Sequence, residues 1–451
     1  MSFLTRIKED PMLSRVLRSS GALFSTNTIS LGLSVIQSIL AARLLGPAGY
    51  GLVGLIMGYA STVNGLLSFR MSELVVRYGG EYLEKGENEK AAALVKAAAL
   101  SEALVSLLAF LVVTVTATLA SQYITKTSGT ALLFIIYGLG LLANFNTETS
   151  TGVLQLLGKI KYQGTINLVQ SVLTAGLITF TFFTKGNLQF ILYAYLAGKI
   201  VLGFGTFLTA FFQLTQKLGS GWWRAKINTI PRIKELARFA VSSNLSATII
   251  LVFRESEILW VGYFLTSEAA GYYRAAYTII GLLSVTANPL ILTTYPEINK
   301  IVIQKAWPRL KDFLKKITAF SAIYNLALAA GFVIFGKWLL SISGEKYVAA
   351  YPVLLVLLVG LTFNYILFWN RPLLLSLGYP QFPIYVTLIV GILKLALAFL
   401  LIPRYGVVAA GALLSFYYIA SVGIMVIRGI KEINLQENIE LKSHKAAKTQ
   451  R

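Results

Sequence analysis

The sequence ARLLGPAGYG at residues 42–51 lies between two apolar runs, each long enough to cross a membrane. Arg43 is followed by a turn rich in glycine and proline, and a related sequence, SEAAGYYRAA, occurs at residues 267–276. A hydrocarbon core of about 30 Å needs roughly 20 apolar residues of helix, and a helix satisfies its own backbone hydrogen bonds in lipid. We therefore expect the first stretch to be the turn between two membrane-spanning helices.

The composition of the whole chain is typical of an integral membrane protein. Of its 451 residues 56% are hydrophobic and 13% are charged, and the mean hydropathy is +0.69. A soluble core cannot bury this much apolar surface, so lipid must cover the rest. The sequence predicts an all-α polytopic protein with about twelve spans, at residues 20–42, 50–69, 98–120, 131–157, 163–184, 188–212, 239–264, 270–294, 317–340, 350–377, 381–402 and 406–428.

Basic residues are divided unequally between the two sets of connections. With the amino terminus in the cytoplasm, most of the excess positive charge of +21 falls on the cytoplasmic side. The opposite side holds only Arg43, Lys126, Lys185, Lys337, Lys346 and Arg404. This is the positive-inside pattern, so the charge needs no nucleic-acid partner, and we expect a multi-pass protein of the cytoplasmic membrane with both termini in the cytoplasm.

Residues that carry out catalysis or bind metals are scarce. The chain has no cysteine, its one histidine is His444 in the polar tail, and aspartate occurs only at Asp10 and Asp312. The sequence contains no nucleophile–histidine–acid set, phosphate-binding loop or paired-aspartate metal motif. We therefore predict a transporter rather than an enzyme, with no catalytic residue, metal or cofactor.

The chain divides into two halves of six spans. The tripeptide AGY at residues 48–50 recurs at 270–272, in the equivalent outer turn of each half. An even number of spans gives both halves the same orientation, which predicts parallel repeats around a central cavity. The predicted parts are an amino-terminal lobe at 1–213, a cytoplasmic linker at 214–238, a carboxyl-terminal lobe at 239–430 and a basic cytoplasmic tail at 431–451.

Two of these segments carry more specific expectations. The linker sequence GSGWWRAKINTIPRIKELARF at 219–239 fits either a helix lying on the inner membrane interface or a solvated connection with two buried tryptophans. The tail at 431–451 is polar and basic, and we expect it to be disordered.

The sequence resembles the Wzx-like oligosaccharide flippases of the multidrug/oligosaccharidyl-lipid/polysaccharide (MOP) exporter superfamily, over nearly the whole chain. The similar segments are ARLLGPAGYGL at 42–52, RYGGEYLEKGENEKAAALVKAAAL at 77–100, GVLQLLGKIKYQ at 152–163, AAGYYRAAYTI at 269–279 and LLSLGYPQFPIYVTLIVGILKLALAFLLIPRYGVVAAG at 374–411. The resemblance implies two six-helix lobes that alternate access to a central cavity and move polyprenyl-diphosphate-linked glycans. The implied partners are that substrate, membrane lipids and other polysaccharide-assembly proteins. One departure is RESE at 254–257, where the family often has a single acidic residue.

Charged residues inside the spans are the candidate substrate-binding residues. Each would cost roughly 2.5–3.5 kcal/mol or more if it faced lipid at mid-bilayer, so most should face the protein interior, water or one another. The candidates are Arg254, Glu257, Arg274, Lys199, Arg371, Lys394 and Glu148. We expect the first three to form the central site, because an arginine can donate two parallel hydrogen bonds to a diphosphate. The alternative is a closed structural ion network that admits no ligand.

Four functions are considered for this sequence. The first is a flippase for a polyprenyl-diphosphate-linked oligosaccharide, in which no covalent bond changes. The second is a drug or metabolite antiporter of the same superfamily, which a more aromatic cavity with one dominant carboxylate would favour. A membrane glycan polymerase or ligase would need a large outer loop, whereas the predicted outer connections are short. A non-transporting scaffold would not require charges inside its spans.

Overall fold

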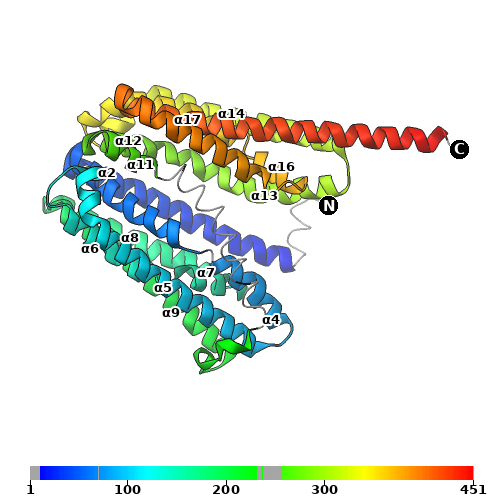
Figure 1. The fold of residues 1–451 in the computed structure, drawn as a ribbon, viewed down its shortest axis with the longest axis horizontal. Coiled ribbons are helices and arrows are strands. Elements are labelled where there is room, and N and C mark those ends of the chain that lie inside the picture. Colours follow the sequence, from blue (N-terminus) through cyan, green and yellow to red (C-terminus); the bar gives the residue numbers. More distant parts are fainter. Residues whose placement is uncertain (1–10, 70, 231–235, 237–252, 254–255, 450–451) are drawn as a thin grey trace. The chain divides into compact units, whose positions relative to one another are not determined.

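The computed structural model describes residues 11–69, 71–230, 236, 253 and 256–449, and the regular structure within these ranges is helical. The chain forms two compact units (Figure 1). The first comprises Met1–Leu45 and Leu52–Leu251, and the second comprises Gly46–Gly51 and Val252–Arg451. The turn quoted above therefore groups with the second half of the chain, although both helices that it joins belong to the first.

The first unit is built from long helices and a short helical segment at Met71–Glu84. Its helices are α2 (Pro11–Leu67), α3 (Met71–Leu74), α4 (Gly80–Glu84), α5 (Asn88–Ala120), α6 (Ala131–Ala143), α7 (Thr147–Leu156), α8 (Lys161–Phe183) and α9 (Leu188–Leu218). A π-helical turn, η1 (Val75–Gly79), connects α3 with α4. Within α2, Gly46 has a φ of 65°, a left-handed conformation that glycine adopts without steric cost, and Pro47 follows it. These two residues make the predicted turn between the first two spans.

The second unit has the same kind of architecture. Its described helices are α11 (Glu257–Phe264), α12 (Ser267–Ile280), α13 (Ser284–Ile303), α14 (Trp307–Ser341), α15 (Tyr351–Ile366), α16 (Asn370–Ser376) and α17 (Phe382–Thr449). Gly406 interrupts α17 with a φ of 68°, as Gly46 interrupts α2. Each of these two glycines separates a pair of predicted spans.

The carboxyl-terminal tail is helical, so the expectation of disorder was wrong. Helix α17 continues to Thr449 and extends past the other helices of its unit (red in Figure 1). Lys311 of α14 forms an ion pair with Glu437, and Ile433 packs in a buried cluster with Trp307 and Leu310. These contacts anchor the first turns of the tail, and helix-forming residues propagate the helix beyond them.

Helices long and apolar enough to cross a membrane account for most of the predicted spans. There are eight such helices in the described ranges, and the two longest, Thr28–Glu84 and Phe382–Glu440, each cover two predicted spans. The eighth predicted span corresponds to α12 and α13, whereas most of the seventh, 239–264, lies outside the described residues. Two further predicted spans are divided: α6 ends at Ala143 before α7 begins at Thr147, and α15 ends at Ile366 before α16 begins at Asn370.

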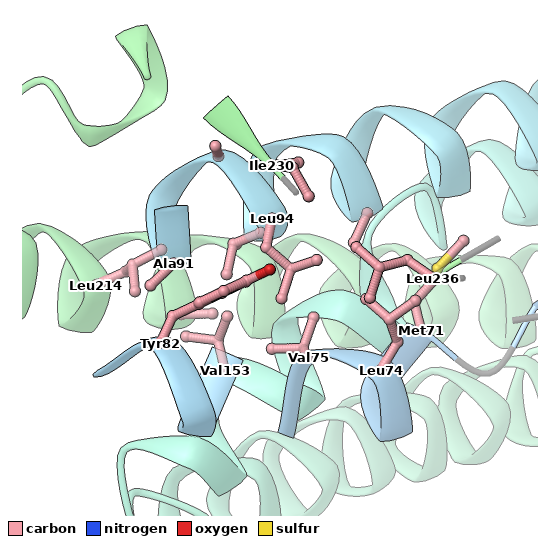
Figure 2. Packing of buried hydrophobic residues seen from close by; sticks show 14 of the residues in the cluster. Met71, Leu74, Val75, Tyr82, Ala91, Leu94, Val153, Leu214, Ile230 and Leu236 are labelled. Carbon is pink, nitrogen blue, oxygen red and sulfur yellow. The ribbon is translucent and has the colours of Figure 1, made fainter. Parts of the chain in front are cut away.

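A buried apolar cluster in the first unit joins the α3–α4 segment to the helices around it (Figure 2). The cluster combines side chains from α3, η1, α4, α5, α7, α9 and the following linker. Labelled members include Met71, Leu74, Val75, Tyr82, Leu94, Val153, Leu214, Ile230 and Leu236. Burial of this apolar surface fixes the segment that follows the second span.

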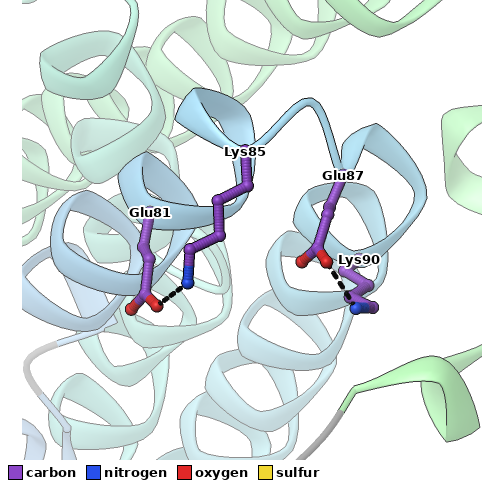
Figure 3. A network of polar contacts seen from close by, with 4 residues as sticks. All are labelled: Glu81, Lys85, Glu87 and Lys90. Carbon is purple, nitrogen blue, oxygen red and sulfur yellow. Dashed lines mark hydrogen bonds and ion pairs between the residues drawn. The ribbon is translucent and has the colours of Figure 1, made fainter.

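Two ion pairs flank the turn between α4 and α5 (Figure 3). Lys85 contacts Glu81 at 2.5 Å, and Lys90 contacts Glu87 at 2.7 Å. The hydrogen bond to Glu81 raises the pKa of Lys85 above its ordinary value. Exposed pairs of this kind contribute little to stability. The buried cluster therefore stabilises the packing of α4 against α5 more than these ion pairs do.

The described part of the linker is not the predicted interfacial helix. It forms two 3-10 turns, Trp222–Arg224 and Ile227–Thr229. Trp222 packs against Phe211 and donates a hydrogen bond to Thr215 at 3.1 Å, whereas Trp223 is 42% exposed. Trp223 nevertheless stacks on the same Phe211 ring, at 5.7 Å between ring centres. Residues 219–230 therefore form a connecting segment, but neither tryptophan is buried as that alternative expected.

Candidate functional site

A buried ion pair links two helices of the second unit. Lys394 of α17 is 0% exposed and Glu257, the first residue of α11, is 2% exposed. The ammonium group contacts one carboxylate oxygen of Glu257, donates a hydrogen bond to the Phe253 carbonyl at 2.6 Å and lies 5.7 Å from the centre of the Tyr417 ring. The other carboxylate oxygen of Glu257 is buried and has no hydrogen-bond partner among the described residues.

The carbonyl that Lys394 contacts belongs to Phe253, which precedes α11 in the chain. Helix α11 begins only at Glu257, four residues after Phe253. The Phe253 ring packs against Gly391 of α17 so closely that a Cβ there would lie 2.3 Å from it. Gly391 therefore provides the space that brings the Phe253 carbonyl within reach of Lys394, one helical turn away.

The two AGY sequences meet in the second unit. A Cβ on Gly271 would lie 2.0 Å from the Pro47 carbonyl oxygen, and one on Gly51 would lie 1.7 Å from that of Ser267. Such contacts are open only to glycine, so the repeated glycines allow two backbones to approach closely.

An aromatic cluster surrounds Arg274 beside this crossing. Its guanidinium lies 4.4 Å from the centre of the Tyr50 ring and donates to the Tyr50 carbonyl at 3.4 Å. Tyr347 packs edge-on against Tyr50 and Tyr272. The position of the Arg274 guanidinium over the Tyr50 ring is a cation–π contact.

A membrane-embedded lysine in the first unit has a different environment. Lys199 of α9 is half-buried and lies 5.0 Å from the centre of the Tyr137 ring on α6. No carboxylate lies within ion-pair distance of it among the residues that the structure describes. Gly140 makes room for its stem, because a Cβ there would lie 3.0 Å from the Lys199 Cδ. Lys199 is thus a basic residue in a spanning helix without an ion-pair partner in the described part of the chain.

The interruption between α6 and α7 is held by a buried carboxylate. Glu102 of α5 is 7% exposed, and its two oxygens accept hydrogen bonds of 2.8 Å from the backbone N–H groups of Glu148 and Thr149. The positive end of the α7 dipole and its unpaired N–H groups favour an anion here. The Glu148 side chain accepts a hydrogen bond of 2.6 Å from Ser72.

The structure therefore separates the predicted site residues into several environments. Glu257 is brought together with Lys394, and Arg274 with Tyr50. Lys199 and Glu148 lie in the first unit, Arg371 on α16 is exposed, and Arg254 lies outside the described residues. Whether any of these residues binds substrate stays a prediction.

Sequence reasoning did not identify the aromatic partners or the role of Glu102. Tyr137 occurs in an apolar run and Tyr50 ends the AGY tripeptide at 48–50, and neither position indicated a cationic partner. The sequence NFNT at 144–147 does contain a signal for the helix interruption, because asparagine and threonine side chains favour helix starts over helix interiors. A new helix start leaves backbone N–H groups unpaired, and an acidic residue elsewhere in the bundle can cap them.

These groups can hold ions and polar ligands. Within the described ranges, no three His, Asp or Glu side chains form a metal-binding group. The available chemistry is an ammonium beside an aromatic ring at Lys199, a neutralised pair at Glu257 and Lys394, and a carboxylate on a helix start at Glu102. Such arrangements suit binding and conformational change.

Comparisons with known proteins identify the family. A sequence model described as "Polysaccharide biosynthesis protein" matches residues 16–302. The chain is 22% identical over 362 residues to the inner membrane protein YghQ of Escherichia coli (strain K12), covering 76% of this chain and 97% of YghQ.

Solved transporter structures share the fold. An inward-facing multidrug resistance MATE family transporter of the MOP superfamily matches with a TM-score of 0.70 and 16% identity, over 90% of this chain and 95% of that one. The lipid II flippase MurJ in an inward closed conformation matches with a TM-score of 0.67 and 14% identity, over 92% and 89% of the two chains. This multi-pass membrane protein therefore belongs to the polysaccharide biosynthesis protein family and has the fold of MOP-superfamily transporters.

Proposed function

We propose that this protein is a flippase for a polyprenyl-diphosphate-linked oligosaccharide and that it carries out no covalent chemistry. The observation that carries the proposal is the environment of Lys199, a cation within a spanning helix with no carboxylate at ion-pair distance in the described ranges. Membership of the polysaccharide biosynthesis family and the fold shared with a lipid II flippase support the same substrate class.

The chemistry of the substrate matches this environment. A diphosphate is the charged part of such a lipid, and an ammonium group can attract it strongly in a site of low dielectric. An ammonium can bind phosphate oxygens from several directions, which suits a ligand that must also leave. In this proposal the polyprenyl tail stays in the bilayer while the charged group and the sugars cross within the protein.

The direct test is transport of a fluorescent lipid-linked oligosaccharide in proteoliposomes containing the purified protein. We expect wild type to move the lipid between leaflets and Lys199→Met to slow this movement at least tenfold. Lys337→Met is the matched control, because Lys337 also lies over a tyrosine ring, Tyr351, at 5.3 Å but is exposed. Equal transport rates for Lys199→Met and wild type would show that Lys199 does not bind the substrate. No movement of the lipid by wild type would refute the proposed function.

A drug antiporter is the second candidate, because the likeness to a multidrug MATE transporter has a TM-score of 0.70. The two functions predict opposite effects of the same variant. A cationic drug is repelled by an uncompensated lysine, so Lys199→Met would leave or increase drug export, whereas a diphosphate lipid would lose its counter-charge. Energised vesicles loaded with an ethidium-type dye distinguish these outcomes.

The orientation in the membrane is also part of the proposal. The positive-inside pattern supports cytoplasmic termini. Reporter fusions after Lys126, Lys185 and Lys346 should report an external location, and fusions after Lys226 and Lys305 an internal one. A reversed pattern at any two of these sites would contradict the orientation.

A further inference from the structure

The buried pair in the second unit has the ligand set of a site for a monovalent cation. Around the Lys394 ammonium lie a carboxylate oxygen of Glu257, the backbone carbonyl of Phe253 and the face of the Tyr417 ring. The carbonyl comes from Phe253, four residues before α11, and the carboxylate comes from the first residue of that helix. Backbone carbonyl and carboxylate oxygens also serve as ligands for Na⁺ in membrane transporters.

The second carboxylate oxygen of Glu257 also supports a cation site. It is buried and has no hydrogen-bond partner among the described residues. An ion pair that served only to join α11 and α17 would be more stable with this oxygen satisfied, because a buried acceptor without a partner carries a desolvation penalty. A free cation that is smaller than the lysine ammonium group and is not attached to a side chain could contact both carboxylate oxygens at once.

We propose that this is a monovalent-cation site whose occupant is the side chain of the protein itself, the Lys394 ammonium. The positive charge that holds the start of α11 against α17 is then covalently attached and cannot dissociate. The wild-type protein consequently needs no Na⁺ at this place, and the site becomes a Na⁺ site when the lysine is removed. This inference is independent of the substrate proposed above.

The physical basis of the test is linkage between ion binding and stability. Lys394→Ala leaves the Glu257 carboxylate buried without its counter-charge and opens the space that the lysine stem filled. An ion that binds only the folded state raises its stability, and each tenfold rise in Na⁺ above the dissociation constant raises the apparent folding constant about tenfold. A purely structural pair gives no such response.

The experiment measures thermal unfolding of the purified full-length protein in detergent, with NaCl replacing choline chloride at constant ionic strength. We expect the same Tm for wild type in both salts, a lower Tm for Lys394→Ala in choline chloride, and a progressive recovery as Na⁺ rises. Lys394→Met, which fills the space without a charge, and Lys394→Ala/Glu257→Ala, which removes the carboxylate, should not respond to Na⁺. Lys199→Ala is the matched control, because it removes a lysine that has no paired carboxylate.

Two results would overturn the inference: a wild-type Tm that rises with Na⁺ relative to choline, or a Lys394→Ala protein that is destabilised equally in both salts. If Lys394→Ala is not recovered from membranes, Lys394→Ser takes its place, since the serine hydroxyl can itself coordinate Na⁺. Loss of both variants from cells grown in sodium-rich medium, with recovery of the double variant, would show that the pair is structural.

Discussion

Replacing Gly271 with alanine tests whether the repeated AGY sequence exists to let two backbones cross. The added Cβ would lie 2.0 Å from the Pro47 carbonyl oxygen and 2.8 Å from its carbonyl carbon, whereas Cβ atoms in proteins essentially never approach another atom within 3.0 Å. Both contacts are to backbone, so no side chain can rotate away. The turn at 46–51 and the start of α12 would have to separate by about 1 Å.

The expected cost follows from this displacement. Overpacking a well-packed site costs about 1–3 kcal/mol, and the rigid backbone on both sides places Gly271→Ala near the upper end. Separation would also weaken the contact of Arg274 with the Tyr50 ring, which lies beside the crossing. For a unit of about 200 residues, 3 kcal/mol corresponds to a fall in Tm of roughly 6–12 °C.

Thermal unfolding in detergent measures this effect, and Gly281→Ala is the matched control. A Cβ on Gly281 meets no atom within 4 Å and its φ is −53°, so alanine there should be neutral or slightly stabilising. The reasoning is refuted if the two variants unfold within about 1 °C of each other. The backbones of Gly271 and Pro47 could not then lie close enough to place an added Cβ 2.0 Å from the Pro47 oxygen.

Substitutions at Glu102, Gly140 and Asn187 test other contacts by the same unfolding assay, combined for Gly140 with the lipid-movement assay. Glu102→Ala removes the acceptor for two backbone N–H groups and should destabilise the protein by about 3–5 kcal/mol. We expect about half this loss for Glu102→Gln and about 1 kcal/mol for the control Glu148→Gln. Equal effects of all three variants would contradict the capping role of Glu102. Gly140→Ala presses on the Lys199 stem and should slow lipid movement more than it lowers Tm, and a pure loss of stability would argue against a role of Lys199 in binding. Asn187 accepts hydrogen bonds from two N–H groups at the start of α9, so Asn187→Ala should cost about 1 kcal/mol, and no measurable loss would mean that water replaces the cap.

The sequence predicted what depends on local composition. Apolar runs located the spans because lipid requires a minimum helix length, and glycine with proline marked the turn at Gly46 because few other residues adopt its backbone angles. The recurrence of AGY indicated a relation between the halves, but one sequence could not reveal that Gly51 and Gly271 lie at the same crossing. Contacts of this kind join segments more than 200 residues apart, and periodicity carries no information about them.

The pairing of charged residues and the structure of the tail were not predicted correctly from the sequence. Glu257 and Arg274 were expected together because they are close in sequence, whereas the partner of Glu257 is Lys394, which lies 137 positions away. The tail at 431–449 was expected to be disordered from its polarity, but alanine, leucine, lysine, glutamine and glutamate are also good helix formers. A helix already nucleated by a membrane span extends through such residues at little cost.

The continuity of α17 has a mechanical consequence. From Arg428, the predicted end of the last span, to Thr449 the helix extends about 31 Å, at 1.5 Å per residue. A stiff rod of this length acts as a lever arm: a tilt of about 10° in the span would move its tip by roughly 5 Å, as follows from that length. A fluorophore placed near the tip, in a chain with no native cysteine to compete for labelling, would convert small rotations within the bilayer into displacements large enough to be followed in single molecules.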